Sequence, residues 1–237
     1  MITKPLAPSL NAYNDIPSLF NEAAGSPSIG QLPVECLLLI DSGYSHTTVT
    51  PLIRGQPVQQ AIRRLDVGGK LMSNYLKELL SVRHVALTDE PYLVNEIKEA
   101  ACFVSDDFRR DLDRTWKGGV RDRRDVDASV VVDYVLPDYD TRHHGEIRPH
   151  DPLQAARTKR LGAASGSKEY ALPLGNERFA VPELLFNPSD VGLKEAGLPE
   201  VIMQSLAALP SGLWPAMLAN IVLVGGNAKI PGLTERL

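Results

Sequence analysis

The sequence predicts an α/β fold, in which short strands and amphipathic helices alternate along the chain and pack in layers. Two apolar runs, at 36–40 and 221–224, each end in a glycine-containing turn, as buried strands do. Between them, apolar residues recur at helical spacing after Gly68 and again over 90–104. The chain has 237 residues, of which 43% are hydrophobic, so it is long enough to bury a sizeable core.

Composition excludes several classes of protein. The 25 Lys and Arg residues are balanced by 29 Asp and Glu residues, which gives a net charge of −4 and argues against a highly basic protein that wraps nucleic acid. No apolar run approaches the roughly 18 residues needed to span a bilayer. Two cysteines cannot form a disulfide framework, and the first residues lack a secretion signal, so a reducing compartment is expected. We therefore expect no membrane partner and no direct sequence-specific DNA binding.

The N-terminal segment, residues 1–34, differs from the rest of the chain. It contains five prolines and no sustained periodicity, which predicts an irregular segment with a short helical turn near 19–24. Residues 35–237 are predicted to form the folded domain.

The first part of this domain is predicted to be an antiparallel meander followed by two helices. A buried strand at 36–40 ends in a tight turn, a β-branched run at 47–53 returns beside it, and 61–67 forms a third strand. The apolar spacing from Leu71 to Leu80 predicts a helix, and a second helix is expected over about 90–104.

The remaining elements are predicted in chain order from similar patterns. They are a solvated helix end and loop at 106–127, a strand at 129–136, an exposed loop insertion at about 137–170, helices at 180–185 and 199–209, and a buried strand at 221–224.

Two strand-to-turn junctions could carry chemistry. Asp41 and Gly43 follow the first strand, where an aspartate can hold hydrated Mg²⁺ and a glycine lets backbone N–H groups approach a phosphate. Gly225 and Gly226 follow the last strand and would let a bulky ligand lie against the main chain. Taken singly, each junction is more often only a tight turn.

Five stretches in collinear order give these junctions a context: residues 36–51, 64–71, 96–108, 176–189 and 223–232. They resemble the phosphate-binding hairpin, the strand-to-helix passage, the adenine-side helix, the most recognisable block and the adenosine loop of actins and actin-related proteins. The resemblance spans about 36–235 and implies the actin-like fold shared with Hsp70 and sugar kinases. Beside that two-lobed family, we expect the chain to represent mainly the C-terminal lobe, without the N-terminal lobe and the extreme C-terminus.

The resemblance also implies a nucleotide site that holds ATP or ADP with Mg²⁺. The implied residues are Asp41 and Gly43 at the Mg²⁺-bound water and the phosphates, Lys98 and Glu99 beside the ribose and adenine, and Gly225 and Gly226 under the nucleotide. Asp41 would contact the metal through water. With only one side of the site expected in this chain, nucleotide binding should be weak or structural.

Departures from the family pattern imply loss of hydrolysis. Tyr44 stands where actin has a second aspartate in the hairpin, and Thr48 stands where actin has a histidine near the attacking water. His46 lies outside that histidine position, and Ile230 replaces the aromatic residue of the adenosine loop. Because phosphoryl transfer depends on charges placed around an in-line nucleophile, we expect no enzymatic activity.

Residues 41–45, 67–71, 133–138 and 186–192 resemble a nuclear branch of the actin-related proteins. That branch implies a non-catalytic subunit of a SWR-type chromatin remodelling complex, which replaces a conventional histone with its variant and so regulates transcription. The implied partners are subunits of that complex and, indirectly, histones and the nucleosome. The implied location is the nucleus, with the cytoplasm also open. The alternatives are an actin-fold protein that binds and hydrolyses ATP, or a cytoskeletal actin-related protein.

Other noticeable residues have simpler interpretations. Cys36 and Cys102 are expected to be small core residues. The histidines and aspartates of 138–150 fit no standard metal spacing, and the basic residues of 157–160 suit an exposed loop. Trp214 is expected to pack in the core.

Overall fold

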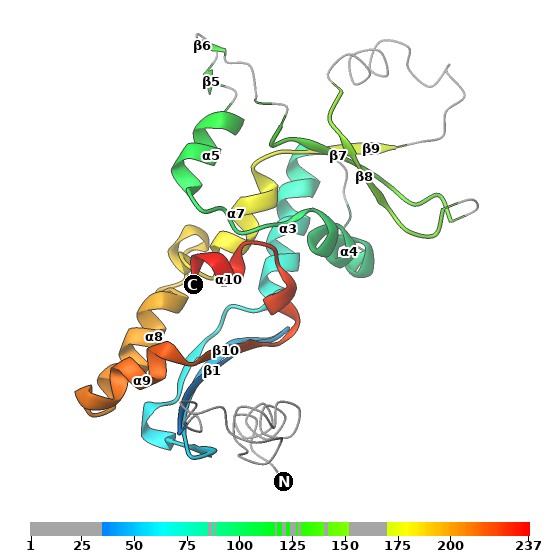
Figure 1. The fold of residues 1–237 in the computed structure, drawn as a ribbon. Helices are drawn as coiled ribbons and strands as arrows, with labels where there is room; N and C mark the ends of the chain where they lie inside the picture. Colours follow the sequence, from blue (N-terminus) through cyan, green and yellow to red (C-terminus); the bar gives the residue numbers. More distant parts are fainter. Residues whose placement is uncertain are drawn as a thin grey trace, which may run out of the picture. The chain divides into compact units, whose positions relative to one another are not determined.

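The structure is a computed structural model that describes residues 35–84, 87, 89–116, 118–119, 122–123, 127, 129–139, 142–151 and 170–237 (Figure 1). The irregular segment predicted at 1–34 lies outside these residues. The chain divides into two compact units. The first contains the described residues up to Leu71 together with Leu184–Lys229 and Leu237, and the second contains Met72–Glu183 and Ile230–Arg236.

The first unit is built on a five-stranded sheet. Its strands are β1 (Cys36–Ser42), β2 (Thr47–Ile53), β3 (Gln56–Pro57), β4 (Arg63–Leu65) and β10 (Ile221–Val224). The order is β10-β1-β2-β3, and β4 also pairs with β2. β10 runs parallel to β1, with Asp41 opposite Val224, whereas the pairings within 36–65 are antiparallel.

The strands predicted at 36–40 and 47–53 are confirmed. Five consecutive apolar residues of β1 are buried because both faces of this central strand are covered. The third predicted strand, 61–67, is shorter than expected, since a 3₁₀ turn (Gln59–Ala61) precedes β4. β3 and β4 both pair with β2, so the expected meander branches at that strand.

The strand predicted at 221–224 exists, but the expectation that it is buried is wrong. Ile221 is 36% exposed and the other three residues of β10 are half-buried. Among the described strands, β10 pairs only with β1, so it lies at an edge of the sheet. Its apolar run covers the side of a core cluster, where Val222 and Val224 pack against Leu37 and Leu39.

Two helices accompany this sheet: α8 (Leu198–Ala207) contacts β2 and β4, and α9 (Trp214–Ala219) contacts β1. α8 begins one residue before the predicted start and buries one face, whereas the short α9 was not predicted and buries Met217. Trp214 is half-buried, so its expected place in the core is wrong. Its indole N–H donates to the carbonyl oxygen of Leu209 at 3.3 Å.

The second unit combines helices with small sheets. Its helices are α3 (Gly69–Arg83, which begins in the first unit), α4 (Pro91–Ala101), α5 (Phe108–Thr115), α7 (Glu177–Glu183) and α10 (Leu233–Arg236). β7 (Val132–Val135) pairs with β8 (Glu146–Pro149) on one side and β9 (Ala171–Leu174) on the other, and β5 (Gly118–Gly119) pairs with β6 (Asp122–Arg123).

Two elements of this unit lie in segments that were predicted to be largely loop. The helix predicted over 90–104 ends at Ala101, and α5 follows it as a separate helix within 106–127, which was predicted as a solvated helix end and loop. α5 carries charges of both signs around its axis, which hides its helical period, and Asp107 caps its first turn by accepting from Arg110 N at 3.1 Å. β8 lies within the predicted insertion at 137–170, much of which is outside the described residues.

In the part of the chain that the structure describes, no helix has both the length and the apolar character required to cross a membrane.

Candidate functional site

The first strand-to-turn junction is held by a chain of uncharged hydrogen bonds. Thr47 Oγ1 donates to the carbonyl oxygen of Val67 at 2.9 Å, so the buried Ser42 hydroxyl donates in turn to Thr47 Oγ1 at 3.0 Å. Asn227 Nδ2 donates to Ser42 Oγ at 3.1 Å and to the carbonyl oxygen of Gly43 at 2.8 Å. The buried Asn227 therefore ties the first junction to the turn that follows β10.

The second junction approaches the first through Gly225. This glycine has a φ of 96°, which favours glycine, and a Cβ at its position would lie 2.3 Å from the carbonyl oxygen of Ser42 and 2.9 Å from Asp41 Oδ1. A Cβ on Gly226 would meet nothing within 4 Å. Of the paired glycines, Gly225 is required by close backbone approach and Gly226 borders open space.

Asp41 lies at the end of β1, partly exposed and directly opposite Thr48 in the register of β1 and β2. Residues directly opposite in an antiparallel pair place their side chains on the same face. The structure thus brings Asp41, Gly43, Gly225 and Gly226 together within one unit, with the Asp41 carboxylate beside Gly225.

The main chain of Gly43 is engaged inside the hairpin. Its N–H donates to the carbonyl oxygen of His46 at 3.1 Å, and its own carbonyl oxygen accepts from Gly69 N at 3.0 Å. Gly68 allows this fit, because a Cβ there would lie 2.6 Å from His46 N. Sequence reasoning did not assign Gly68 or Asn227 to the site; an amide directly after the Gly225–Gly226 pair is the signal that could have found Asn227.

The two hairpin residues that were expected to occupy catalytic positions, Tyr44 and Thr48, are uncharged. Tyr44 is 62% exposed at the hairpin tip, and Thr48 is buried on β2. His46 is buried as well, with its Nδ1 2.7 Å from Ser45 Oγ. The hairpin residues 42–48 therefore carry hydroxyl groups and one buried imidazole, and none of them carries a second carboxylate.

Lys98 and Glu99 lie on α4 in the second unit. Lys98 is buried, and its Nζ donates to Asn95 Oδ1 at 2.8 Å and to Ser73 Oγ at 3.1 Å. Burial lowers the pKa of Lys98, against the opposing effects of Glu99 and Cys102. Glu99 is exposed and accepts from Asn95 Nδ2 at 2.8 Å. Lys98 is therefore a desolvated ammonium that donates to the neutral side chains of Asn95 and Ser73 within this unit.

Cys102, which follows α4, is buried as predicted for a core residue, and Cys36 is buried in β1. Burial raises the pKa of the Cys102 thiol to about 12, while Lys98 and Arg178 act in the opposite direction. A thiol with that pKa stays protonated at neutral pH, so it is poorly suited to act as a nucleophile.

Two of the histidines near β8 lie beside a carboxylate. His150 Nδ1 lies 2.7 Å from Asp133 Oδ1, and His144 Nδ1 lies 3.4 Å from Glu96 Oε1. Within the described ranges, no group of three or more His, Cys, Asp or Glu residues has a geometry that could hold a metal ion. The basic residues at 157–160 lie outside those ranges.

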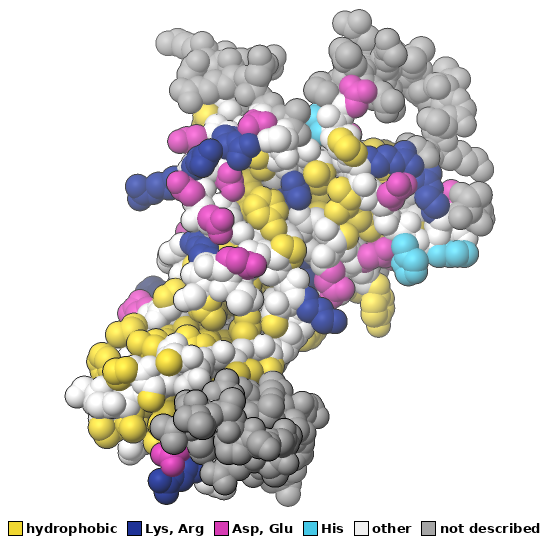
Figure 2. Space-filling model, viewed as in Figure 1, with side chains coloured by type: hydrophobic (Ala, Val, Ile, Leu, Met, Phe, Trp, Pro, Cys, Tyr) yellow, Lys and Arg dark blue, Asp and Glu magenta, His cyan; other side chains and the backbone are white. Residues whose placement is uncertain are grey.

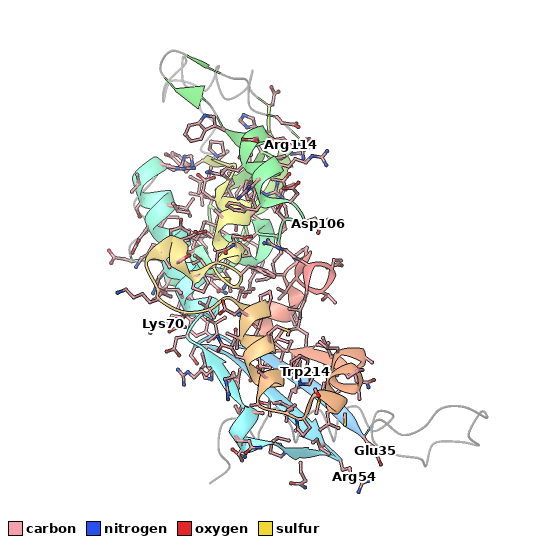
Figure 3. All side chains as sticks on the ribbon, turned by 90° about the vertical axis from the view of Figure 1, so that its left-hand side faces the viewer. Glu35, Arg54, Lys70, Asp106, Arg114 and Trp214 are labelled. Atoms are coloured by element: carbon pink, nitrogen blue, oxygen red, sulfur yellow. The ribbon has the colours of Figure 1, made fainter. Side chains whose placement is uncertain are left out.

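A cavity of about 420 Å³ lies in the second unit between the start of α5 and residues 231–235. Charges of both signs line it, including Asp106 and Arg114, which are labelled in Figure 3. Arg114 is bound to Asp111 at 3.2 Å and to Asp127 at 2.8 Å. These residues were not among the predicted site residues.

Comparison with known proteins supports the resemblance that the sequence motifs indicated. The family model described as Actin matches residues 6–237, a match that begins well before the first motif quoted above. The chain is 54% identical over its whole length to the actin-like protein arp6 of Emericella nidulans and 53% identical over 98% of its length to the actin-related protein 6 of Neurospora crassa. It is 41% identical over 92% of its length to the actin-related protein 6 of Drosophila melanogaster.

In each of these comparisons the chain spans about half the length of the relative, 51% in all three. The family model nevertheless covers almost all of this chain, and the observed mixed sheet with helices is the α/β architecture that the resemblance implied. The chain belongs to the actin family.

Proposed function

We propose that this chain is a non-catalytic actin-related subunit of a SWR-type chromatin remodelling complex in the nucleus. In this role it supports the exchange of a conventional histone for its variant by binding other subunits, and it contacts histones only through them. The support is the identity of 53–54% to fungal relatives named arp6 or actin-related protein 6, together with the motifs that resemble the nuclear branch of the family.

The observation that carries the non-catalytic part is the chemistry around Asp41. The residue opposite Asp41 in the sheet is Thr48, and the hairpin tip is Tyr44, so neither neighbour supplies a carboxylate or an imidazole. A water near Asp41 would therefore not find in Tyr44 or Thr48 the charges that position it for in-line attack on a phosphate. This arrangement favours a pocket that binds nucleotide only for a structural purpose, or binds none, and it argues against a pocket that hydrolyses ATP.

We also propose that the first unit, taken alone, binds nucleotide weakly. Asp41 is the one carboxylate among the four predicted site residues of this unit, and the Gly43 N–H donates to His46. The Gly43 N–H is therefore not free for a phosphate placed here, and we expect ATP or ADP with Mg²⁺ to need groups from elsewhere. We expect Asp41 to contact the metal through water when such groups are supplied.

Affinity purification from nuclear extract followed by mass spectrometry tests the assembly. We expect remodeller subunits to be recovered in stoichiometric amounts with the tagged protein. Recovery of cytoskeletal proteins without any remodeller subunit would contradict the proposal.

The nucleotide part is tested separately with the purified chain. We expect calorimetric titration with Mg²⁺-ATP to give no micromolar binding and single-turnover assays to give hydrolysis at the background rate. D41N is the matched variant, because it removes the carboxylate and keeps the shape. Micromolar binding or hydrolysis that D41N abolishes would overturn this part and favour the ATP-hydrolysing alternative.

A further inference from the structure

Asn227 is the buried link between the two strand-to-turn junctions. It lies in the 3₁₀ turn Gly226–Lys229, which follows β10, and only 5% of its surface is exposed. Its Nδ2 donates to Ser42 Oγ at 3.1 Å and to the carbonyl oxygen of Gly43 at 2.8 Å. A side-chain amide has two N–H donors, and both are therefore used on the first hairpin. The strands that lead into the two turns, β1 and β10, run side by side in Figure 1.

The orientation of this amide is fixed by its partner Gly43. A carbonyl oxygen can only accept, so the atom of Asn227 that faces Gly43 O is the nitrogen. The same oxygen also accepts from Gly69 N at 3.0 Å, and with two lone pairs it is then saturated. The Gly43 N–H donates to the carbonyl oxygen of His46 at 3.1 Å. Both main-chain polar groups of Gly43 are thus satisfied by the chain itself.

The buried Ser42 hydroxyl is satisfied in the same way. It accepts from Asn227 and donates to Thr47 Oγ1 at 3.0 Å, and Thr47 Oγ1 donates onward to the carbonyl oxygen of Val67 at 2.9 Å. This row of hydrogen bonds ends on a carbonyl oxygen, so no ligand is needed to complete it. Every group in the row is uncharged, and in Figure 2 the surface of the same unit over α8 and α9 is also mostly hydrophobic or otherwise uncharged.

Close backbone packing supports these hydrogen bonds on two sides. A Cβ on Gly225 would lie 2.3 Å from Ser42 O, and a Cβ on Gly68 would lie 2.7 Å from Tyr44 O. The hairpin, residues 41–48, is therefore held between the turn after β10 and the passage into α3. Both contacts are made by the main chain of the first unit.

The nucleotide that the family implies has space on another side of the junction. There Asp41 is partly exposed, and a Cβ on Gly226 would meet nothing within 4 Å. A carboxylate beside a glycine turn suits Mg²⁺-bound water and a phosphate, so these residues fit the group. Asn227, in contrast, is buried and binds the hairpin from within. A bound nucleotide would add stability according to its affinity for the folded state, but the closing bonds are already present without it.

We propose that Asn227 is a latch that keeps the hairpin closed in the absence of any ligand, so that the fold of the first unit does not depend on ATP, ADP or Mg²⁺. This inference deepens the proposed function, because it rests on a pocket that is structural and does not turn over nucleotide. It goes beyond weak binding, since a weak site without a latch would leave the empty hairpin open to solvent.

The test measures hydrogen exchange of the backbone amides over 41–48 in the purified whole chain by mass spectrometry. Wild type is compared in EDTA and in millimolar Mg²⁺-ATP. The variants are N227A, which removes both donors, and N227D, which keeps the shape but turns an acceptor toward Gly43 O. N220A and N220D are the matched controls, because Asn220 Nδ2 also donates to a carbonyl oxygen of the same unit, that of Ala216 at 2.9 Å, through an exposed hydrogen bond.

We expect slow exchange over 41–48 in wild type, with equal rates in EDTA and in Mg²⁺-ATP. N227A should exchange about tenfold faster there, and N227D faster still, because a buried carboxylate would face a carbonyl oxygen. N220A and N220D should keep the wild-type rate over 41–48. If N227D does not fold, N227A and the comparison of wild type with and without ligand still decide the question.

Wild-type exchange that slows by about tenfold on addition of Mg²⁺-ATP would overturn the latch, because the nucleotide would then close the hairpin. Exchange in N227A at the wild-type rate would also overturn it, as would equal acceleration in N227A and N220A. Failure of the proposed function is read from different assays: affinity purification without remodeller subunits, or hydrolysis that D41N abolishes, would reject that function whatever the exchange rates over 41–48.

Discussion

The two compact units stabilise their buried polar groups in different ways. In the first unit, the buried polar side chains that the structure describes are Ser, Thr, His and Asn, and its turns fit together by close backbone approach at Gly68 and Gly225. The second unit buries carboxylates and an ammonium group: Glu177, Glu183 and Lys98 are at most 4% exposed. Arg236 holds Glu183 through two hydrogen bonds, and Arg83 reaches Glu177 at 2.5 Å.

This difference indicates which kind of substitution should destabilise each unit most. A turn that depends on backbone contact is disturbed by added volume, whatever its charge. A buried ion pair is disturbed when one partner is removed, because the other charge is left in a medium of low polarity. The first unit should therefore respond to steric change and the second to changes in charge and pH.

The largest expected effect is in the second unit. R236M removes the partner of a carboxylate that is 1% exposed, and we expect it to lower the free energy of unfolding by about 4 kcal/mol. Urea denaturation followed by circular dichroism measures the loss. E183Q/R236M removes the stranded charge and should recover much of it; a double variant as unstable as R236M would show that the charge is not the cause.

Added volume in the first unit should come next. G225A places a methyl group 2.3 Å from Ser42 O at a φ of 96°, and we expect a loss of about 3 kcal/mol. G226A is the control, since nothing lies within 4 Å of its Cβ position. Thermal unfolding of both variants measures the difference, and equal melting temperatures would show that the turn relaxes around the methyl group.

The pH response of Cys102 separates the units further. Its pKa is raised by burial from 9.0 to about 12, so between these values the folded state keeps a proton that the unfolded state loses. Stability should therefore fall as pH rises from 9, with a contribution of about 2 kcal/mol by pH 10.5.

Unfolding of C102A across pH 8 to 10.5 should show a correspondingly shallower fall than wild type. C36A, in the first unit, is the control and should keep the wild-type slope. The comparison is between slopes because burial shifts the pKa of the neighbouring Lys98 downward, which contributes a change of stability with the opposite sign. Parallel profiles for C102A and wild type would exclude this assignment.

The smallest expected effect concerns the charged helix α5. D107A removes the side chain that accepts from Arg110 N at the first turn, and we expect a loss of about 1 kcal/mol. D113A, on the exposed side of the same helix, should be neutral or slightly stabilising. Hydrogen exchange of the α5 amides measures both, and protection that is unchanged in D107A would rule out the cap as a stabilising contact.

Several elements could be predicted because local sequence and tertiary environment agree. The apolar run of β1 and the β-branched run of β2 are buried strands with the expected partners. α5 and β8 could not be predicted from local sequence. α5 has no continuous apolar stripe, and β8 is a strand because it pairs with β7. β10 was placed correctly, but its exposure depends on its position at an edge of the sheet, which an apolar tetrapeptide does not encode.

The predicted site shows the same division. Sequence patterns placed Asp41, Gly43, Gly225 and Gly226 at turns, and the structure brings the two turns together through Asn227. Only the structure distinguishes Gly225, which has no space for a side chain, from Gly226, which has. The burial of Lys98 against Ser73 and Asn95 could likewise not be predicted from the sequence of α4, which indicates only its amphipathic spacing.

By itself, the sequence determined the family, the α/β class and the central strands, because apolar period, turn residues and motif order are local properties. Tertiary structure decided which glycine is indispensable, which charges are buried and which apolar side chains remain exposed. These properties depend on what lies across a contact from each residue, and that neighbour is usually distant in the chain.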